Sequence, residues 1–157
     1  MALRKIVTDE DPLLRKVSRE VGTPNDRTRA LLDDMIDTLK YAEGVGLAAP
    51  QVGILRRIFI INTGIEEGRD EFVEFIDPII IKTSGEQDGA EGCLSVPGKQ
   101  GNVVRPDKVT VEATDRNGKR FRFTGTDLMA RCLCHEYDHL DGILYVDKAY
   151  EMLSDED

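Results

Sequence analysis

The segment His135-Glu136-Tyr137-Asp138-His139 constrains this chain more than any other part of its sequence. Its two histidines are the only histidines among 157 residues, and they stand four positions apart. Side chains four apart lie on the same face of an α-helix, so both imidazoles can reach a single metal ion. The segment therefore predicts a helix that turns this face toward the interior of the fold.

The hydropathy pattern extends this helix from Thr126 to Asp141, with Thr126 as the expected N-cap and Gly142 as the stop. At about 100° per residue, both histidines share an apolar sector with Glu136 and several leucines. A buried carboxylate is costly unless something balances its charge, so this arrangement favours a cation nearby. Two core histidines with a hydrogen-bonded glutamate are the simpler alternative. The opposite, polar side of the helix is expected to hold Asp127, Arg131, Cys134, Asp138 and Asp141.

The pattern does not by itself name a third ligand. A catalytic metal commonly takes three protein ligands and leaves a position for water. Downstream, Asp147 and Glu151 are candidates in or near a charged tail; upstream, Cys93 precedes a Pro-Gly turn that would present its thiolate. We favour Cys93 over the alternative that it is a small core residue. Cys132 is expected to be pocket wall, and Cys134 to point away from the histidines.

The rest of the chain combines one early helix with extended segments. The apolar residues of 26–42 fall on one helical face, which predicts a helix from Asp26 to Ala42, with Asn25 as its N-cap and Gly44 as its stop. Extended segments are expected at 58–61, 72–81, 109–113 and 121–123. This order predicts an α+β fold with a mostly antiparallel sheet, an N-terminal helix and a late metal-binding helix.

Turn residues refine this expectation. Pro78 lacks an amide donor and should lie at a sheet edge or a bulge. Asn117-Gly118 predicts a β-hairpin, because both residues tolerate positive φ at the central turn positions. Residues 1–147 are expected to form one catalytic domain, and the acidic tail, 148–157, is expected to fray.

Composition excludes several classes of protein. The net charge of −9 makes broad binding of nucleic acid unfavourable. No apolar run approaches the roughly 20 residues that span a membrane, and the charged N-terminus does not match a signal peptide. We therefore expect a cytoplasmic protein whose three cysteines are free thiols or metal ligands.

A glycine-rich loop, Gly44 to Gly53, follows the early helix. It matches neither a phosphate loop nor a dinucleotide-binding fingerprint. Its small residues would let a peptide backbone come close, and Gln51 offers an amide that can stabilise an oxyanion. An ordinary helix-to-strand turn is the alternative.

Three segments together resemble the peptide deformylase family: GVGLAAPQVG at 44–53, EGCLSVPG at 91–98 and HEYDHLDG at 135–142. The resemblance covers nearly the whole chain. It implies a metal-dependent amidase that removes the N-formyl group from the initiator methionine of new bacterial chains, so that N-formylmethionyl nascent peptides are its expected partners. Some members dock to the ribosome through a basic C-terminal helix, and the acidic end of this chain argues against that route.

The resemblance also implies roles for individual residues. The metal would be held by Cys93, His135 and His139, and Glu136 would act as general base and acid. Gln51 and the backbone amide of Leu94 would face the oxyanion. The residues that match the substrate groove and methionine pocket are Val45, Gly46, Leu128 and Cys132, and a buried ion pair that braces the cysteine loop is implied for Glu91 and Arg105. Ferrous iron is the usual metal of the family, and zinc, nickel or cobalt can replace it.

Two other functions fit the same motif. A small zinc endopeptidase would take its third ligand from a downstream carboxylate. A structural zinc protein would close the site with Cys93, both histidines and another cysteine, and Glu136 would then have no task.

Overall fold

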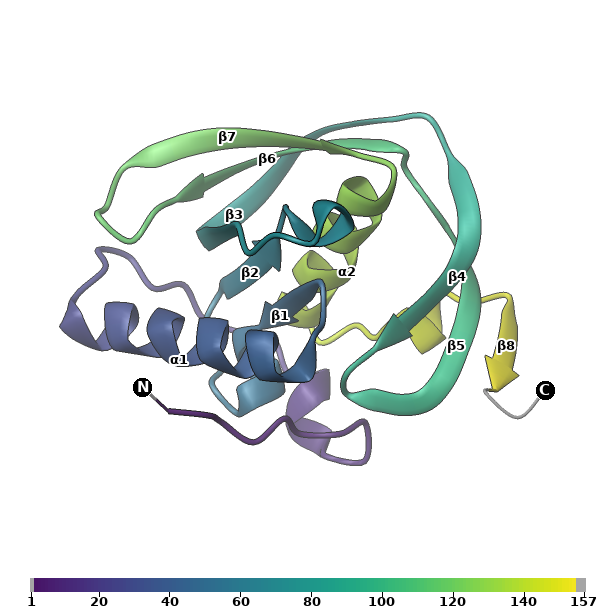
Figure 1. Ribbon diagram of the computed structural model, residues 1–157, viewed down its shortest axis with the longest axis horizontal. Helices are drawn as coiled ribbons and strands as arrows, with labels where there is room; N and C mark the ends of the chain where they lie inside the picture. Colours follow the sequence, from purple (N-terminus) through teal and green to yellow (C-terminus); the bar gives the residue numbers. More distant parts are fainter. Residues whose placement is uncertain (1, 155–157) are drawn as a thin grey trace.

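The computed structural model describes residues 2–154, which form two antiparallel sheets around one central helix (Figure 1). The five-stranded sheet has the order β1 (Gly46–Ala48), β2 (Ile58–Asn62), β3 (Phe72–Ser84), β6 (Lys108–Thr114) and β7 (Arg120–Thr126). The three-stranded sheet has the order β4 (Gln87–Cys93), β5 (Val96–Arg105) and β8 (Glu151–Ser154). The helices are α1 (Asp26–Ala42) and α2 (Leu128–Leu140), and the short 3-10 turns are η1 (Pro12–Arg15), η2 (Ala49–Val52), η3 (Ile65–Glu67) and η4 (Tyr145–Asp147). The predicted α+β class is confirmed.

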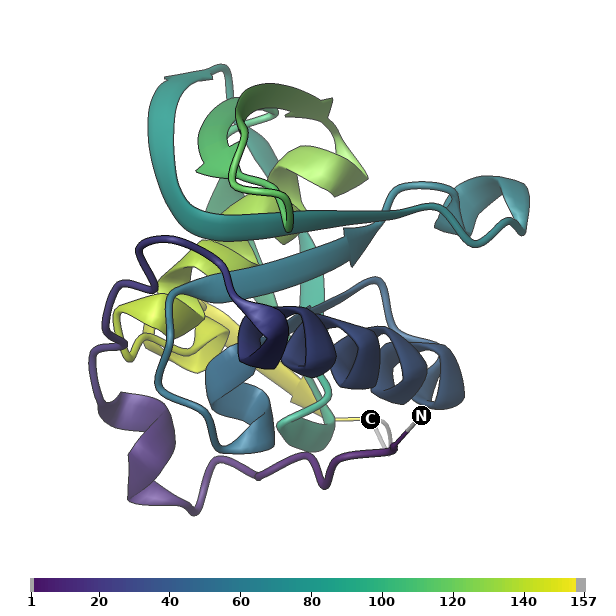
Figure 2. The ribbon, with the colours of Figure 1, turned by 90° about the vertical axis from the view of Figure 1, so that its left-hand side faces the viewer.

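Strand β2 explains why the two helices lie on opposite faces of the larger sheet (Figure 2). Successive side chains of a strand point to opposite faces. Phe59 and Ile61 pack in the cluster that contains the apolar side of α2, whereas Ile58 and Ile60 pack with α1. A strand covered on both faces needs apolar residues at every position, which the sequence Ile-Phe-Ile-Ile supplies.

Helix α1 has the predicted bounds. Asn25 caps it, because its side chain accepts from the Thr28 amide while the Thr28 hydroxyl accepts from the Asn25 amide. The predicted stop is displaced by one residue, since Glu43 and not Gly44 adopts the left-handed conformation, with φ of 56°. Glycine at position 44 avoids a steric clash, because a Cβ there would lie 3.0 Å from side-chain atoms of both Leu39 and Leu94.

Pro78 lies at a bulge, which is one of the two positions predicted for it. The register of β3 against β6 shifts between Ile76 and Ile79, and Asp77 adopts φ of 48°. The Asp77 carboxylate accepts hydrogen bonds from the amides of Val21 and Gly22. The bulge therefore ties the N-terminal segment to the middle of the sheet.

The hairpin between β6 and β7 is confirmed, but its turn differs from the expected one. Gly118 has φ of 85°, whereas Asn117 is not among the described residues with positive φ. The Asp115 carboxylate accepts from the amides of Asn117 and Lys119, and the Asp115 amide donates to the Lys119 carbonyl. This longer loop needs only one left-handed residue, which is the glycine.

The predicted start of the late helix is wrong. Thr126 is the last residue of β7, where it pairs with Lys108, and Asp127 is the N-cap without a side-chain cap bond. Strand pairing holds Thr126 extended, so the helix can begin only after it. At the other end, Gly142 has φ of 73°, as expected for the residue that stops the helix.

The prediction of a frayed tail is wrong for residues 151–154, which form β8 and pair with residues 99–102 of β5. The Tyr150 hydroxyl donates to the Asp88 carboxylate on the neighbouring hairpin. Backbone pairing thus overrides the acidic composition. The last part of the predicted tail, 155–157, lies outside the described residues. Within residues 2–154, no helix combines the length and apolarity needed to cross a bilayer.

Candidate metal centre and active site

The middle of α2 and the end of β4 bring three potential metal ligands together. The Sγ of Cys93 and one ring nitrogen from each of His135 and His139 lie within 4.8 Å of one another. The Cys93 Sγ is 3.4 Å from the His139 Nε2, and the two imidazole rings meet edge to face with centroids 4.9 Å apart. The three residues predicted as ligands therefore converge, although Cys93 is more than 40 positions from either histidine.

This arrangement fits a divalent cation. Metal–nitrogen and metal–sulfur bonds of about 2.0–2.3 Å separate two tetrahedral ligands by roughly 3.3–3.7 Å. The observed 3.4 Å between Sγ and Nε2 lies in that range. A divalent cation would also balance the charges of a Cys93 thiolate and the neighbouring Glu136 carboxylate, both of which are costly to hold away from water.

Cys93 owes its position to the tight turn between β4 and β5. Cys93 pairs with Val96, so the chain reverses through Leu94 and Ser95. Gln51 of η2 secures this turn, because its Nε2 donates to the Ser95 Oγ at 3.0 Å and to the Cys93 Sγ at 3.4 Å. The amide of Ala48 fixes the other end of the Gln51 carboxamide by donating to Oε1.

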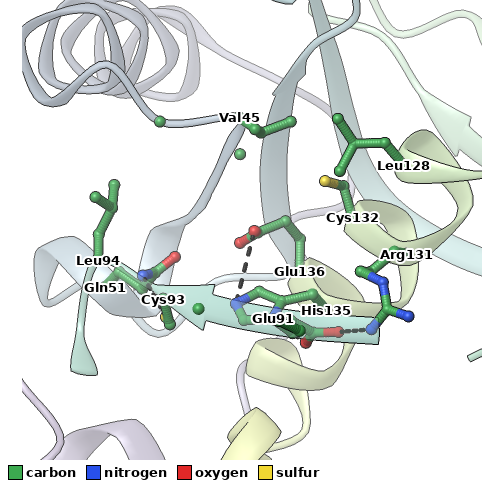
Figure 3. Close-up of a pocket in the computed structure, with 14 residues that line it drawn as sticks. Val45, Gln51, Glu91, Cys93, Leu94, Leu128, Arg131, Cys132, His135 and Glu136 are labelled. Atoms are coloured by element: carbon green, nitrogen blue, oxygen red, sulfur yellow. Dashed lines mark hydrogen bonds and ion pairs between the residues drawn. The ribbon is translucent and has the colours of Figure 1, made fainter. Parts of the chain in front are cut away.

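Glu136 lies beside the ligand cluster without a hydrogen bond. It is 4% exposed, and among the described residues its buried Oε1 has no partner. Its Oε2 is 4.0 Å from the His135 Nε2 (Figure 3). Burial raises the pKa of Glu136 to about 7, and the charge of His135 offsets only part of that effect. A bound cation would favour the ionised form.

Glu91 lies on the other side of His135 and is fully paired. Its carboxylate accepts from the His135 Nδ1, from Arg105 through Nε and Nη2, and from Arg131 through Nη1. Arg105 also donates to Asp138 at 2.8 Å. We call Glu91, Arg105, Arg131 and Asp138 the buried charge network; its two positive and two negative side chains balance.

This network fixes the histidine that would bind metal. Burial favours the neutral form of Glu91, but hydrogen bonds from His135 and Arg105 outweigh it and hold the pKa of Glu91 well below its usual range. The carboxylate therefore directs Nδ1 of His135 toward itself and leaves Nε2 for the ligand cluster. A carboxylate behind a ligating imidazole is a common device for orienting the ring.

The other histidine is not held in this way. The His139 Nδ1 is buried and has no hydrogen-bond partner among the described residues. Burial lowers the pKa of His139 well below its usual value, and the charge of His135 adds to that effect. This shift favours the neutral imidazole, which is the form that can bind a metal.

The prediction that Arg131, Cys134 and Asp138 lie on the polar, solvent-facing side of α2 is wrong. All three are buried: Arg131 and Asp138 pair with charged residues of the β4–β5 hairpin, and Cys134 packs in the apolar cluster of the larger sheet. The Glu91–Arg105 ion pair implied by the resemblance is present in the buried charge network, whereas Arg131 and Asp138 were not predicted to belong to it. A usable signal existed: they stand four positions before and three after His135, and these spacings place side chains on one face.

A cavity of about 240 Å³ opens beside the ligand cluster (Figure 3). The candidate residues that line it are Val45, Gly46, Gln51, Glu91, Cys93, Leu94, Leu128, Cys132, His135 and Glu136, and Arg131 is an additional member. Arg105 and His139 are not among the described residues that line it. Val45, Leu128 and Cys132 give one side of the cavity an apolar surface.

The residues invoked by the two alternative functions lie elsewhere. Asp147 pairs with Arg15, and Glu151 accepts from Asn102, so neither downstream carboxylate joins the cluster. Within residues 2–154 the cluster contains a single cysteine, and Cys132 and Cys134 are free thiols outside it. Burial raises the pKa of both thiols, which disfavours the thiolate needed for binding a metal.

This chain is similar to known proteins over nearly its whole length. The family model of polypeptide deformylase matches residues 3–154. The peptide deformylase of Alkaliphilus metalliredigens is 54% identical over 148 residues, which cover 94% of this chain and 97% of that protein. The peptide deformylase of Acetivibrio thermocellus is 48% identical over 157 residues, covering 100% and 89% of the two chains.

Solved structures show the same fold. A peptide deformylase from Legionella pneumophila superposes with a TM-score of 0.89 at 44% identity, covering 99% of this chain and 88% of that one. A peptide deformylase from Synechococcus elongatus, in complex with actinonin, gives 0.87 at 38% identity over 92% and 79% of the chains. This chain belongs to the polypeptide deformylase family of metal-dependent enzymes.

Proposed function

We propose that this chain hydrolyses the N-formyl group of formylmethionyl peptides and releases formate. The observation that carries the proposal is a cluster of one thiol and two imidazoles beside a buried, unpaired carboxylate, at the wall of a cavity. Newly synthesised bacterial chains are the substrate class, which locates the activity in the cytoplasm.

Cys93, His135 and His139 would hold one divalent cation, for which we propose ferrous iron, with zinc, nickel or cobalt as substitutes. When bound, such a cation acts as a Lewis acid and lowers the pKa of a coordinated water to about 7. A thiolate and two imidazoles suit several of these metals, so geometry and availability decide between them.

Glu136 moves the proton. Its buried Oε1 has no competing donor among the described residues, so the carboxylate is free to accept a proton from the attacking water. The same carboxyl then gives the proton to the departing amine. Among the described residues that line the cavity, the only other carboxylate belongs to Glu91, whose oxygens are both occupied.

Gln51 and Leu94 stabilise the negative charge that develops on the formyl oxygen. The Gln51 carboxamide is held at both ends, so its Nε2 reaches the cavity wall at a fixed position. We assign the second donor to the backbone amide of Leu94. Donors fixed before the reaction need no reorganisation when charge develops.

The methionine side chain would occupy the apolar side of the cavity, against Val45, Leu128 and Cys132. Gly46 would lie beside the peptide backbone. Residues 151–154 form a strand, β8, and none of them is basic, so we assign this segment no ribosome-docking role.

The test is formate release from formyl-Met-Ala-Ser by protein purified anaerobically with iron, alongside a metal analysis. Metal-loaded protein that releases no formate would reject the proposal. Cys93→Ser is the matched variant: we expect it to lose both metal and activity, whereas retained metal would favour the endopeptidase with a different third ligand.

A further inference from the structure

Within residues 2–154, no hydrogen bond holds the Glu136 carboxylate. Its Oε1 is buried without a partner among the described residues, and its Oε2 lies 4.0 Å from the His135 Nε2, which is too far for a hydrogen bond. Glu91, by contrast, is held by three side chains. Packing must therefore position Glu136.

Gly46 supplies the closest part of that packing. A Cβ built on Gly46 would lie 2.8 Å from the Oε2 of Glu136, 3.0 Å from its Cγ and 3.1 Å from its Cδ. Favourable contacts between carbon atoms lie at about 3.5–4.0 Å. Glu136 thus occupies the space that any other residue at position 46 would fill. Figure 3 shows the neighbouring Val45 above the Glu136 carboxylate, where β1 begins.

Backbone conformation does not require glycine at this position. Gly46 is not among the described residues with positive φ, and it pairs with Ile61 in the ladder between β1 and β2. The strand has little freedom to retreat, because the Asn62 amide donates to the Val45 carbonyl at 2.7 Å and Leu47 is fully buried. An added methyl group would therefore displace the untethered carboxylate.

We propose that Gly46 is a positioning residue whose missing side chain sets the location of the Glu136 carboxylate beside the ligand cluster. This inference rests on the proposed function, in which Glu136 moves the proton. It differs from a role in binding the peptide backbone, because it acts through Glu136 and not through the substrate.

The two roles predict different kinetics for Gly46→Ala. Displacement of the general base lowers kcat, and a displacement near 1 Å costs about 10²-fold. Loss of peptide binding raises KM instead. Shortening the acid with Glu136→Asp makes room for the methyl group, so Gly46→Ala should cause no further loss of kcat in that background.

The experiment compares wild type, Gly46→Ala, Glu136→Asp and the double variant, each loaded with metal, using formyl-Met-Ala-Ser. Gly89→Ala is the matched control, because a Cβ there meets nothing nearer than 3.5 Å. We expect Gly46→Ala to keep full metal content and to lower kcat by a larger factor than it raises KM, and Gly89→Ala to keep wild-type kcat. Equal losses in both backgrounds, or an unchanged kcat, would overturn the proposal.

Two further measurements do not depend on activity. A crystal structure of Gly46→Ala should show the Glu136 carboxylate displaced while the ligand cluster is unchanged; an unmoved carboxylate would contradict us. If Gly46→Ala lowers the Tm, adding Glu136→Ala should restore it by opening the same space, and failure to restore it would also count against the proposal. These measurements remain decisive if wild type releases no formate, which would reject only the proposed function.

Discussion

Glu91 and Glu136 are two buried carboxylates on either side of the same imidazole ring, and they have opposite environments. Glu91 accepts from His135 and two arginines, and the hydrogen bonds from His135 and Arg105 hold its pKa well below the usual range. Glu136 has no hydrogen bond among the described residues, and burial raises its pKa to about 7. Saturating a carboxylate with donors makes it a fixed support, whereas leaving it unpaired keeps it available for moving a proton.

The largest effect should follow from Glu136→Gln. The amide cannot accept the proton, so kcat should fall by about 10²–10⁴-fold. Metal content should be retained, and the free energy of unfolding should not decrease, because the substitution removes an unpaired buried charge. Formate release, metal analysis and denaturant titration measure these three quantities. A large loss of stability would show that Glu136, like Glu91, is a structural support.

Glu91→Gln should mainly reduce stability and metal affinity. Arg105 and Arg131 would lose their shared anion, and breaking a buried ion pair typically costs about 3–5 kcal/mol. Metal affinity should fall by about 10–100-fold, because His135 loses the group that orients it. Denaturant titration and metal competition test both effects, with the exposed Glu67→Gln as control. If Glu91→Gln keeps wild-type stability, Glu91 is not a structural support, and the two carboxylates do not differ in that role.

Arg131→Met should have a smaller effect than Glu91→Gln. It leaves one oxygen of Glu91 with fewer donors, but Arg105 still bridges both oxygens, so the free energy of unfolding should fall by about 1–3 kcal/mol. Arg122→Met, at an exposed position of β7, should change it by less than about 0.5 kcal/mol. If both variants behave alike in denaturant titration, Arg131 is not part of the support.

The smallest effect concerns the Cys132 thiol. Burial, followed by the charges of Glu136 and Glu91, raises its pKa, so less thiolate forms at a given pH. Between about pH 7 and 9, alkylation of Cys132 should be slower in the folded protein than in unfolded protein. Glu136→Gln should accelerate it by removing one of the charges. Peptide mapping by mass spectrometry measures the alkylation rate. Equal rates in folded wild type and folded Glu136→Gln would show that the Glu136 charge does not affect the Cys132 thiol.

Much of the ligand cluster could be predicted from local pattern. His135, Glu136 and His139 share one face of α2 because helical spacing alone places them there. The strand predicted at 58–61, which became β2, followed in the same way from an apolar run, the bounds of α1 from its apolar face and N-cap, and the β6–β7 hairpin from a turn glycine. These features depend on residues within about one or two turns of each other, so the sequence contains the information directly.

Features that depend on distant segments could not be read in this way. The sequence by itself determined that one helix turns two histidines and a glutamate inward, because their spacing matches the helical period. Only the tertiary structure decided that Arg131 and Asp138 are buried, that residues 151–154 form a strand, and that Gly46 leaves space for Glu136. Each of these depends on which surface the β4–β5 hairpin, β5 or β1 presents, and burial is a property of the assembled layers.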